Sequence, residues 1–413
     1  MATVKPFLCI RPEEKVAPRV AALPYDVYNR TEAKQEVLRE PMSFLQVDRA
    51  ETNFPEDVDT YDPRVYAKAK ELLSKMLEEG VFLTEKEECY YVYELVMNGR
   101  SQTGLVACAS IDDYLGNIIK KHENTREDKE QDRIHHVDQC DMHTGPIFLA
   151  YRAQYTISEV VSEAKEEVPI YQFVSTDGIS HNVWKIDQMD RIQVIQEAFN
   201  QIDSIYIADG HHRAASAVKV GLKRREQTPE YTGREEFNYF LSVLFPHDQL
   251  MIMSYNRTVK DLNGLTKDGF ILKIKEHFEV NYIGEAPFAP YKKSTYGMYL
   301  EDGWYSLTAK ESLRAVTDPV DSLDVALLQD YLLGPILGIA DPRVDKRIDF
   351  IGGIRGLKEL ERRVREDMTV AFSMYPTSIE ELFAVSDAGK LMPPKSTWFE
   401  PKLRSGLFLH KLT

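Results

Sequence analysis

"SIYIADGHHRAASAVKVG", residues 204–221, passes from an apolar run through a polar cluster into a helical pattern. The apolar run Ile205–Ala208 predicts a buried strand, and the pattern that follows predicts a helix beginning at about Gly210 or His211. Asp209–Arg213 therefore fall at a turn between a strand and a helix. Such a turn is chemically useful, because the first backbone N–H groups of a helix have no partner inside the helix.

The residue types in this turn predict a phosphate site. The positive end of the helix dipole attracts an anion, and Gly210 lets the anion approach the backbone closely. Arg213 can add a bidentate contact to phosphate oxygens, and His211 and His212 can donate hydrogen bonds or move protons near neutral pH. Asp209 stands where it can hold Mg²⁺ or cap the helix. The alternative is a capped helix whose histidines form structural hydrogen bonds.

A second polar segment, "KKHENTREDKEQDRIHH" (residues 120–136), comes before the apolar stretch "GPIFLAY". By itself it is typical of a solvent-exposed helix rich in charges. In front of a buried strand it could instead form the mouth of a pocket, in which Glu123 acts as a general base toward a hydroxyl group. The candidate phosphate-binding residues in this segment are Lys121, Thr125 and Lys129.

Two further stretches contain candidate ligands. In "PPKSTWFEPK" (residues 393–402), hydroxyl and ammonium groups stand beside aromatic rings, which predicts a substrate contact or, alternatively, a terminal strand with an exposed edge. "HHVDQCDMH" (residues 135–143) has enough donor atoms for a metal, but its spacing fits no zinc pattern, so we expect a surface loop. The candidate substrate residues in the first stretch are Lys395, Ser396 and Thr397.

The composition limits the class of protein and its partners. With 413 residues, the chain is long enough for two or three domains. It carries 51 Lys+Arg against 66 Asp+Glu, a formal net charge of −15. Nucleic acids and anionic membrane surfaces bind basic proteins, so we expect neither as a partner. The oligomeric state stays open.

The compartment is predicted from the cysteines and the N-terminus. Four cysteines are scattered without a CxxC pair, which argues against a disulfide scaffold and against a structural zinc site. The N-terminus lacks the apolar core of a signal peptide, and no apolar run is long enough to span a bilayer. We therefore expect a protein of the reducing cytoplasm.

Helices and strands alternate along the chain without a regular strand–helix–strand repeat. This pattern predicts a mixed α+β fold and not a doubly wound parallel sheet. We divide the chain into an N-terminal α/β segment (residues 1–110), a middle segment with both polar motifs (111–260) and a C-terminal α/β segment (261–413).

Three local patterns in the N-terminal segment make definite predictions. "MSFLQVD" (residues 42–48) predicts a strand, and residues 62–82 have apolar side chains at helical spacing with a stop at Gly80. Asn98 and Gly99 separate two apolar runs, which is a strong signal for a β-hairpin.

"DGHHR", together with "KHENT" upstream, resembles the motifs of the ParB/sulfiredoxin-like superfamily. Within it, the chain is similar to the free-serine kinases, which phosphorylate L-serine with ADP or ATP. Their DGxHR-type turn is matched by Asp209, Gly210, His212 and Arg213, and their catalytic glutamate in a His-Glu context is matched by His122 and Glu123. At full length, "LPYDV", "KHENT", "ADGHHR" and "KSTWFEPK" resemble a large, mostly bacterial family of uncharacterised proteins.

The resemblance implies a ParB/sulfiredoxin-like core with N-terminal and C-terminal α/β extensions. It implies a small-molecule kinase that transfers a phosphoryl group from ADP or ATP, with Mg²⁺, to a hydroxyl metabolite such as free L-serine. The catalytic residues would then be Glu123, His122 and Asp209. Two other functions stay open: a regulatory protein that binds a nucleotide or phosphometabolite without turnover, and a phosphoesterase. The kinase hypothesis requires Glu123 and the Asp209–Arg213 turn to meet in one pocket.

Overall fold

The computed structural model describes residues 1–413, which form two compact units. Unit 1 consists of Met1–Leu250 and Pro401–Thr413, and unit 2 consists of Met251–Glu400. The division differs from the three segments expected from the sequence, because strands from residues 1–110 and from residues 111–250 pair in one sheet. No helix has both the length and the apolar composition needed to cross a membrane.

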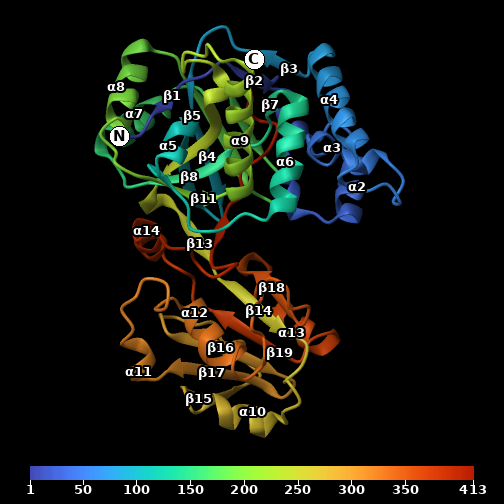
Figure 1. The fold of residues 1–413 in the computed structure, drawn as a ribbon, viewed down its shortest axis with the longest axis vertical. Coiled ribbons are helices and arrows are strands. Elements are labelled where there is room, and N and C mark those ends of the chain that lie inside the picture. The colour runs from blue at the N-terminus through green and yellow to red at the C-terminus, as the bar shows by residue number, and fades with distance from the viewer. The chain divides into compact units, whose positions relative to one another are not determined.

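Unit 1 is built on a nine-stranded mixed sheet (Figure 1). Two neighbouring pairs, β11 with β6 and β12 with β8, are parallel, and the other pairs are antiparallel. The mixed sheet agrees with the α+β class and excludes a doubly wound parallel sheet. In sheet order, the strands are β6 (Ile119–Lys120), β11 (Ile205–Asp209), β8 (Ile147–Tyr151), β12 (Tyr239–Pro246), β5 (Arg100–Ser110), β4 (Tyr90–Met97), β10 (Ser180–Ile186) and β9 (Tyr171–Val174), with β1 (Val4–Lys5) paired to β5.

The stretch from residue 204 to 221 folds as its pattern predicts. β11 (Ile205–Asp209) is buried from Ile205 to Ala208, and α9 begins at His211. The hairpin prediction is also confirmed: β4 and β5 pair antiparallel, and Asn98 and Gly99 have φ angles of 52° and 78°. Both residues of a type I′ turn need such positive angles.

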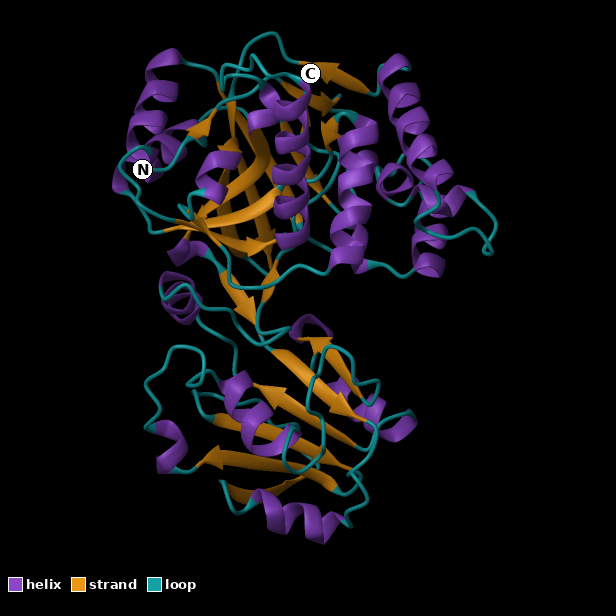
Figure 2. Cartoon of the chain, viewed as in Figure 1, coloured by secondary structure: helices purple, strands orange, loops and turns teal.

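Helices surround this sheet, and α6 and α9 pack side by side (Figures 1 and 2). The helix expected within residues 62–82 is confirmed: α4 ends at Glu78, and Gly80 follows in a left-handed conformation. The helices of unit 1 are α1 (Ala17–Val20), α2 (Arg30–Arg39), α3 (Leu45–Asp48), α4 (Pro63–Glu78), α5 (Ile111–Leu115), α6 (Glu127–Cys140), α7 (Tyr155–Ala164), α8 (Met189–Phe199) and α9 (His211–Gln227), with short 3₁₀ turns η1 (Tyr25–Val27), η2 (Ala50–Asn53), η3 (Glu236–Asn238) and η4 (His247–Gln249).

Two local predictions in unit 1 are wrong. Residues 42–48 contain the helix α3 and no strand, because a short apolar run fits a buried helical turn as well as a strand. The segment 135–143 is not a surface loop: His136 and Cys140 are buried on α6, and His143 is buried on β7 (Met142–His143). Cys140 belongs to a buried apolar cluster of unit 1.

A small sheet joins both ends of unit 1. Its strand β21 (Leu409–Lys411) carries His410, whose Nδ1 lies 3.1 Å from Nδ1 of His143 and whose Nε2 lies 2.6 Å from Glu236. The C-terminal residues of the chain are therefore part of the core of unit 1. The strands of this sheet are, in order, β3 (Phe82–Thr84), β2 (Cys9–Pro12), β21 (Leu409–Lys411) and β7 (Met142–His143).

Unit 2 contains a six-stranded antiparallel sheet and a two-stranded sheet, β13 (Met251–Met253) with β20 (Trp398–Glu400). The six strands are, in order, β15 (Phe278–Gly284), β17 (Gly303–Ala309), β16 (Thr295–Leu300), β19 (Val370–Met374), β14 (Tyr255–Val259) and β18 (Ile348–Gly352). The helices are α10 (Lys267–Ile274), α11 (Glu311–Arg314), α12 (Asp324–Leu328), the π-helical η5 (Gln329–Leu333), the 3₁₀ turn η6 (Gly353–Arg355), α13 (Leu357–Glu366) and α14 (Ile379–Asp387).

Unit 2 buries one carboxyl group whose ionisation should destabilise it. Burial raises the pKa of Asp324 from 3.8 to about 7, although both its oxygens accept from the backbone N–H of Ser294 at 2.9 Å. A raised pKa means that the folded unit holds a proton that the unfolded chain has lost. The free energy of unfolding should therefore fall between about pH 4 and pH 7, by about 2–4 kcal/mol in all.

Asp324→Asn should remove this pH dependence, because the amide stays neutral and keeps one acceptor oxygen. Urea unfolding of both proteins between pH 4.5 and pH 8, followed by tryptophan fluorescence, measures the difference. We expect the variant to gain stability relative to the parent as the pH rises. Parallel pH profiles for the two proteins would show that Asp324 ionises normally in the folded unit.

Candidate functional site

Two polar motifs meet at one edge of the sheet because β6 and β11 are parallel neighbours. Ile119 of β6 pairs with Ile205 of β11, and Lys120 pairs with Tyr206. The carboxyl ends of parallel strands lie at the same edge of a sheet. The segment that follows β6 (residues 121–125) therefore lies beside the Asp209–Arg213 turn that follows β11. A ring nitrogen of His211 and a carboxylate oxygen of Glu123 come within 4.8 Å of each other.

The turn itself depends on Gly210. This residue is the N-cap of α9 with φ 92° and ψ 33°, a left-handed conformation, and no side chain caps the helix. A Cβ atom here would lie 3.0–3.2 Å from the guanidinium of Arg213. Glycine thus allows both the backbone conformation and the close packing of Arg213. With no capping side chain, the first N–H groups of α9 can serve an anion, as the sequence suggested.

The two histidines of the turn hold the neighbouring segment in place. The backbone N–H of His122 donates to Nε2 of His211 at 3.5 Å, and the backbone N–H of Arg126 donates to Nε2 of His212 at 3.0 Å. The rings of His122 and His211 also pack edge to face, with centroids 4.5 Å apart. Both histidines of the turn therefore accept hydrogen bonds from the segment around Glu123 and bind the two motifs together.

Burial keeps the two inner histidines neutral. It lowers the pKa of His122 to about 4, although the charge of Asp209 and a hydrogen bond to the Ile207 backbone raise it. Burial, with the nearby His122, holds the pKa of His211 well below its usual range. At neutral pH, His211 is therefore uncharged and offers no positive charge to a phosphate.

Asp209 faces two cations. Its Oδ2 lies 3.2 Å from Nζ of Lys402 and 4.0 Å from Nη2 of Arg213. Burial raises the pKa of this carboxyl, but the charges of Lys402 and Arg213 outweigh burial and hold the pKa below its usual range. Since two positive side chains already neutralise the carboxylate, its surroundings do not fit the Mg²⁺ ion expected there.

Lys402 is a site residue that the sequence linked only to a possible ligand contact of the "PPKSTWFEPK" stretch, and not to Asp209. It comes from the end of the "KSTWFEPK" stretch and belongs to unit 1, whereas Lys395, Ser396 and Thr397 belong to unit 2. Its motif was visible in the sequence, but only the fold shows which of its residues reaches Asp209.

Lys402→Met should destabilise unit 1, because the uncharged side chain leaves Asp209 with one cation in place of two. Asp209 is about one third exposed, so we expect a loss of about 1–3 kcal/mol in the free energy of unfolding at pH 7, less than for a fully buried pair. Denaturant unfolding measures the loss. Lys402→Arg keeps the charge and should retain most of the stability, and equal losses in both variants would point to packing instead of charge.

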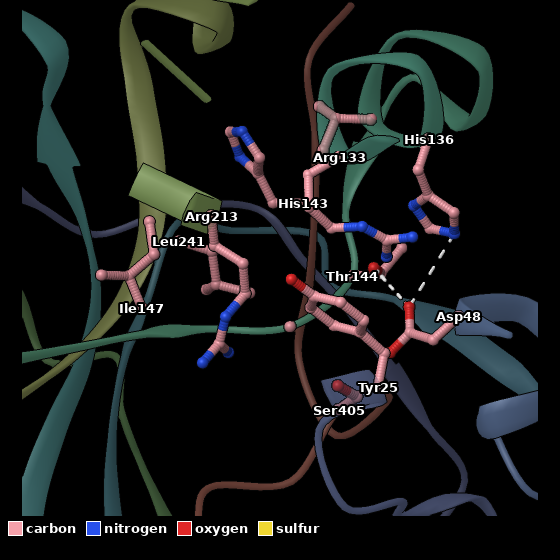
Figure 3. A pocket seen from close by; sticks show the side chains of 12 residues that line it. Tyr25, Asp48, Arg133, His136, His143, Thr144, Ile147, Arg213, Leu241 and Ser405 are labelled. Carbon is pink, nitrogen blue, oxygen red and sulfur yellow. Dashed lines mark hydrogen bonds and ion pairs between the residues drawn. The ribbon is translucent and has the colours of Figure 1, made fainter. Parts of the chain in front are cut away.

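Arg213 extends from the turn to a small pocket (Figure 3). Its Nη1 donates to the carbonyl oxygen of Pro146 at 2.5 Å. The pocket has a volume of about 30 Å³, room for one or two water molecules, so no nucleotide fits inside it. It is lined by Tyr25, Asp48, Arg133, His136, Val137, His143, Thr144, Gly145, Ile147, Arg213, Leu241 and Ser405.

Tyr25 of the "LPYDV" motif lines this pocket. Tyr25 packs beneath the guanidinium of Arg133, which lies 4.1 Å from the centre of its ring. Asp48 accepts from Thr144 at 2.9 Å and lies 3.9 Å from His136, as the dashed lines in Figure 3 show. These contacts hold η1 and α3 against α6 and against the segment between β7 and β8.

The remaining candidates of the second motif have different surroundings. Lys121 is exposed, and its charge contributes to lowering the pKa of His211, so it lies near the turn. Thr125 donates to Glu130 at 2.6 Å, and Nζ of Lys129 lies 2.9 Å from the hydroxyl of Tyr61. Thr125 and Lys129 thus have structural partners.

The candidate substrate residues lie in unit 2. Ser396 donates to the carbonyl of Pro393 at 2.6 Å, Lys395 has Nζ 5.7 Å from the centre of the Tyr255 ring, and Thr397 directly precedes β20. These contacts support the end of unit 2.

Residues 4–326 match the protein family described as a protein of unknown function, DUF1015. The match covers more than half of the chain, and the chain therefore belongs to this family. No curated protein matches the chain.

Several solved structures are similar to the chain at low identity. A free serine kinase in complex with AMP is 16% identical, with 73% of this chain and 92% of that chain covered and a TM-score of 0.36. SbnI with a C-terminal truncation from Staphylococcus aureus is 12% identical, with 73% and 85% covered and a TM-score of 0.39. A conserved hypothetical protein from Pyrococcus furiosus is 15% identical, with 73% and 95% covered and a TM-score of 0.34.

Proposed function

We propose that this chain binds ADP or ATP through its phosphates at the start of α9 and transfers a phosphoryl group to the hydroxyl of a small metabolite. The observation that carries the proposal is the position of Glu123, a carboxylate that comes within 4.8 Å of a ring nitrogen of His211 in the first turn of α9. Phosphoryl transfer needs an anion site and a carboxylate for the acceptor next to each other. The parallel pairing of β6 and β11 brings Glu123 close to the start of α9 and so supports the proposal.

The anion site consists of backbone groups and nearby cations. The N–H groups at the start of α9 lie behind Gly210, where no side chain caps the helix. Arg213 packs against Gly210, and Lys121 is exposed close by. The helix dipole and these two charges all favour a phosphate at this place.

In this proposal, Glu123 is the general base that deprotonates the acceptor hydroxyl. As the acceptor oxygen attacks the terminal phosphorus, its proton passes to the Glu123 carboxylate. The bond between that phosphorus and the nucleotide oxygen breaks, and ADP leaves from ATP, or AMP leaves from ADP. His122 and His211 are neutral and buried, so they position the Glu123 segment and do not take this proton.

The substrate and the superfamily are proposed from the two sequence motifs. "KHENT" and "DGHHR" resemble motifs of the free-serine kinases of the ParB/sulfiredoxin-like superfamily, so free L-serine is the first acceptor to test and residues 111–260 are the proposed ParB/sulfiredoxin-like core. The acceptor should be small and carry a primary or secondary hydroxyl group.

A product assay tests the proposal. The purified full-length chain is incubated with ATP or ADP, with and without Mg²⁺, and with L-serine, L-threonine, L-homoserine or glycerate, and phosphorylated products are identified by mass spectrometry. L-Alanine is the matched control, because it lacks only the hydroxyl of L-serine. We expect a phosphorylated hydroxyl compound and no product from L-alanine.

Two outcomes would contradict phosphoryl transfer. Nucleotide binding without product from any hydroxyl compound would indicate a regulatory binding protein. Release of inorganic phosphate at the same rate with and without an acceptor would indicate a phosphoesterase.

A further inference from the structure

We infer that His122, Glu123 and His211 form a binding site for one divalent transition-metal ion. One donor atom from each of the three side chains lies within 4.8 Å of the other two. The three residues come from two motifs far apart in the sequence and are brought together by the pairing of β6 and β11. The inference deepens the proposed function, since it concerns the same site, but metal binding can be measured without turnover.

His122 has the hydrogen bonding of a metal-ligating histidine. Its Nδ1 is buried and has no hydrogen-bond partner, and the side chain is 2% exposed. The ring also hydrogen-bonds to the backbone of Ile207. Metal-bound histidines commonly donate one ring N–H to a backbone carbonyl and use the other nitrogen for the metal. A bound ion would also satisfy a buried polar atom that is otherwise unpaired.

The set of donor atoms selects the class of metal. Two imidazole nitrogens and one carboxylate oxygen suit Zn²⁺, Fe²⁺, Co²⁺ or Mn²⁺, whereas Mg²⁺ prefers oxygen ligands. Three protein ligands leave at least one position open for water or for an oxygen of a substrate. The site is thus chemically different from the Mg²⁺ site that the sequence suggested at Asp209, where two cations already face the carboxylate.

The geometry requires a modest adjustment. Donor atoms around a Zn²⁺ ion lie about 3–3.5 Å apart. The three donor atoms must therefore come closer to one another by about 1–2 Å. Glu123 is half-buried, and its side chain can supply much of this movement. A carboxylate has two oxygens, so one can bind the metal while the other faces the acceptor hydroxyl in the proposed reaction.

Cobalt binding tests the site directly. The full-length chain is freed of metal with a chelator and titrated with Co²⁺, whose visible absorption reports nitrogen and oxygen coordination. We expect one Co²⁺ per chain, displaced by an equimolar amount of Zn²⁺ and retained in a large excess of Mg²⁺. Zn²⁺ should also raise the melting temperature, because a ligand that binds only the folded state stabilises it.

Three variants locate the ion. His122→Gln, Glu123→Gln and His211→Gln should each weaken Co²⁺ binding by more than about a hundredfold, since loss of a ligand exceeds the effect of losing one of its supporting hydrogen bonds. His135→Gln is the control, because His135 is exposed on α6 and lies outside the cluster. Circular dichroism identifies any variant that fails to fold. Glu123 is the least buried of the three, so Glu123→Gln keeps the test decisive if both histidine variants unfold.

The outcomes separate this inference from the proposed function. Absence of stoichiometric Co²⁺ binding, or unchanged Co²⁺ affinity in folded Glu123→Gln, would overturn the metal site. Nucleotide affinity is measured on the metal-free chain in a separate titration. Co²⁺ binding without nucleotide binding would support the metal site and contradict the phosphotransferase. Nucleotide binding without Co²⁺ binding would contradict the metal site and leave the phosphotransferase supported.

Discussion

Glu123→Gln should lower the rate of phosphoryl transfer by about two to four powers of ten, the usual contribution of a general base. Glutamine keeps the shape of the side chain but has no oxygen basic enough to take the proton of the acceptor hydroxyl. In the proposed site the phosphates contact the start of α9, Arg213 and Lys121 and not Glu123, so nucleotide affinity should change little. Product formation by mass spectrometry and nucleotide affinity by calorimetry measure the two effects separately.

Glu127→Gln is the matched control for this change. Glu127 is exposed in the first turn of α6, a few residues after Glu123, and its substitution removes the same charge. We expect its turnover to stay close to that of the parent. A similar loss of nucleotide affinity in Glu123→Gln and in Arg213→Ala would refute the division of roles between carboxylate and phosphate site.

Arg213→Ala should weaken nucleotide binding by roughly ten- to a hundredfold. A charge-assisted hydrogen bond to phosphate contributes about 1.5–3 kcal/mol, and the arginine lies directly against the turn that we propose as the phosphate site. The structure adds a second effect, because Nη1 of Arg213 also supports the chain at Pro146. The variant should therefore melt at a temperature lower by several degrees, and affinity must be measured on the folded protein.

Arg224→Ala controls for charge and for helix stability. Arg224 lies in the last turn of α9, where it pairs with Asp138 and Asp141, and its loss changes the net charge by the same amount. We expect nucleotide affinity to stay within about twofold of the parent. Arg213→Lys keeps the charge without the planar guanidinium, so its affinity should lie between those of the parent and Arg213→Ala. Unchanged affinity in Arg213→Ala would assign this arginine a purely structural role.

The local structure around the candidate site could be predicted from the sequence, because it depends on neighbours along the chain. An apolar run followed by Asp209 and Gly210 was enough to place the end of β11 and the start of α9. Asn98 and Gly99 likewise determined the hairpin, since few other residues tolerate their φ angles. Short segments without such signals are ambiguous between helix and strand, and residues 42–48 form a helical turn where the apolar run favours a strand.

The convergence of the two motifs was decided by the tertiary structure. β6 has only two residues, too few for any periodic pattern, yet its parallel pairing with β11 brings Glu123 to His211. The same holds for Lys402, which reaches Asp209 because the last residues of the chain return to unit 1. By itself, the sequence determined which residues stand at the turn and what chemistry they offer. Contacts between distant segments decide which charges neutralise Asp209 and which side chains surround His122. Such contacts form only when the sheet brings its strands side by side and buries them.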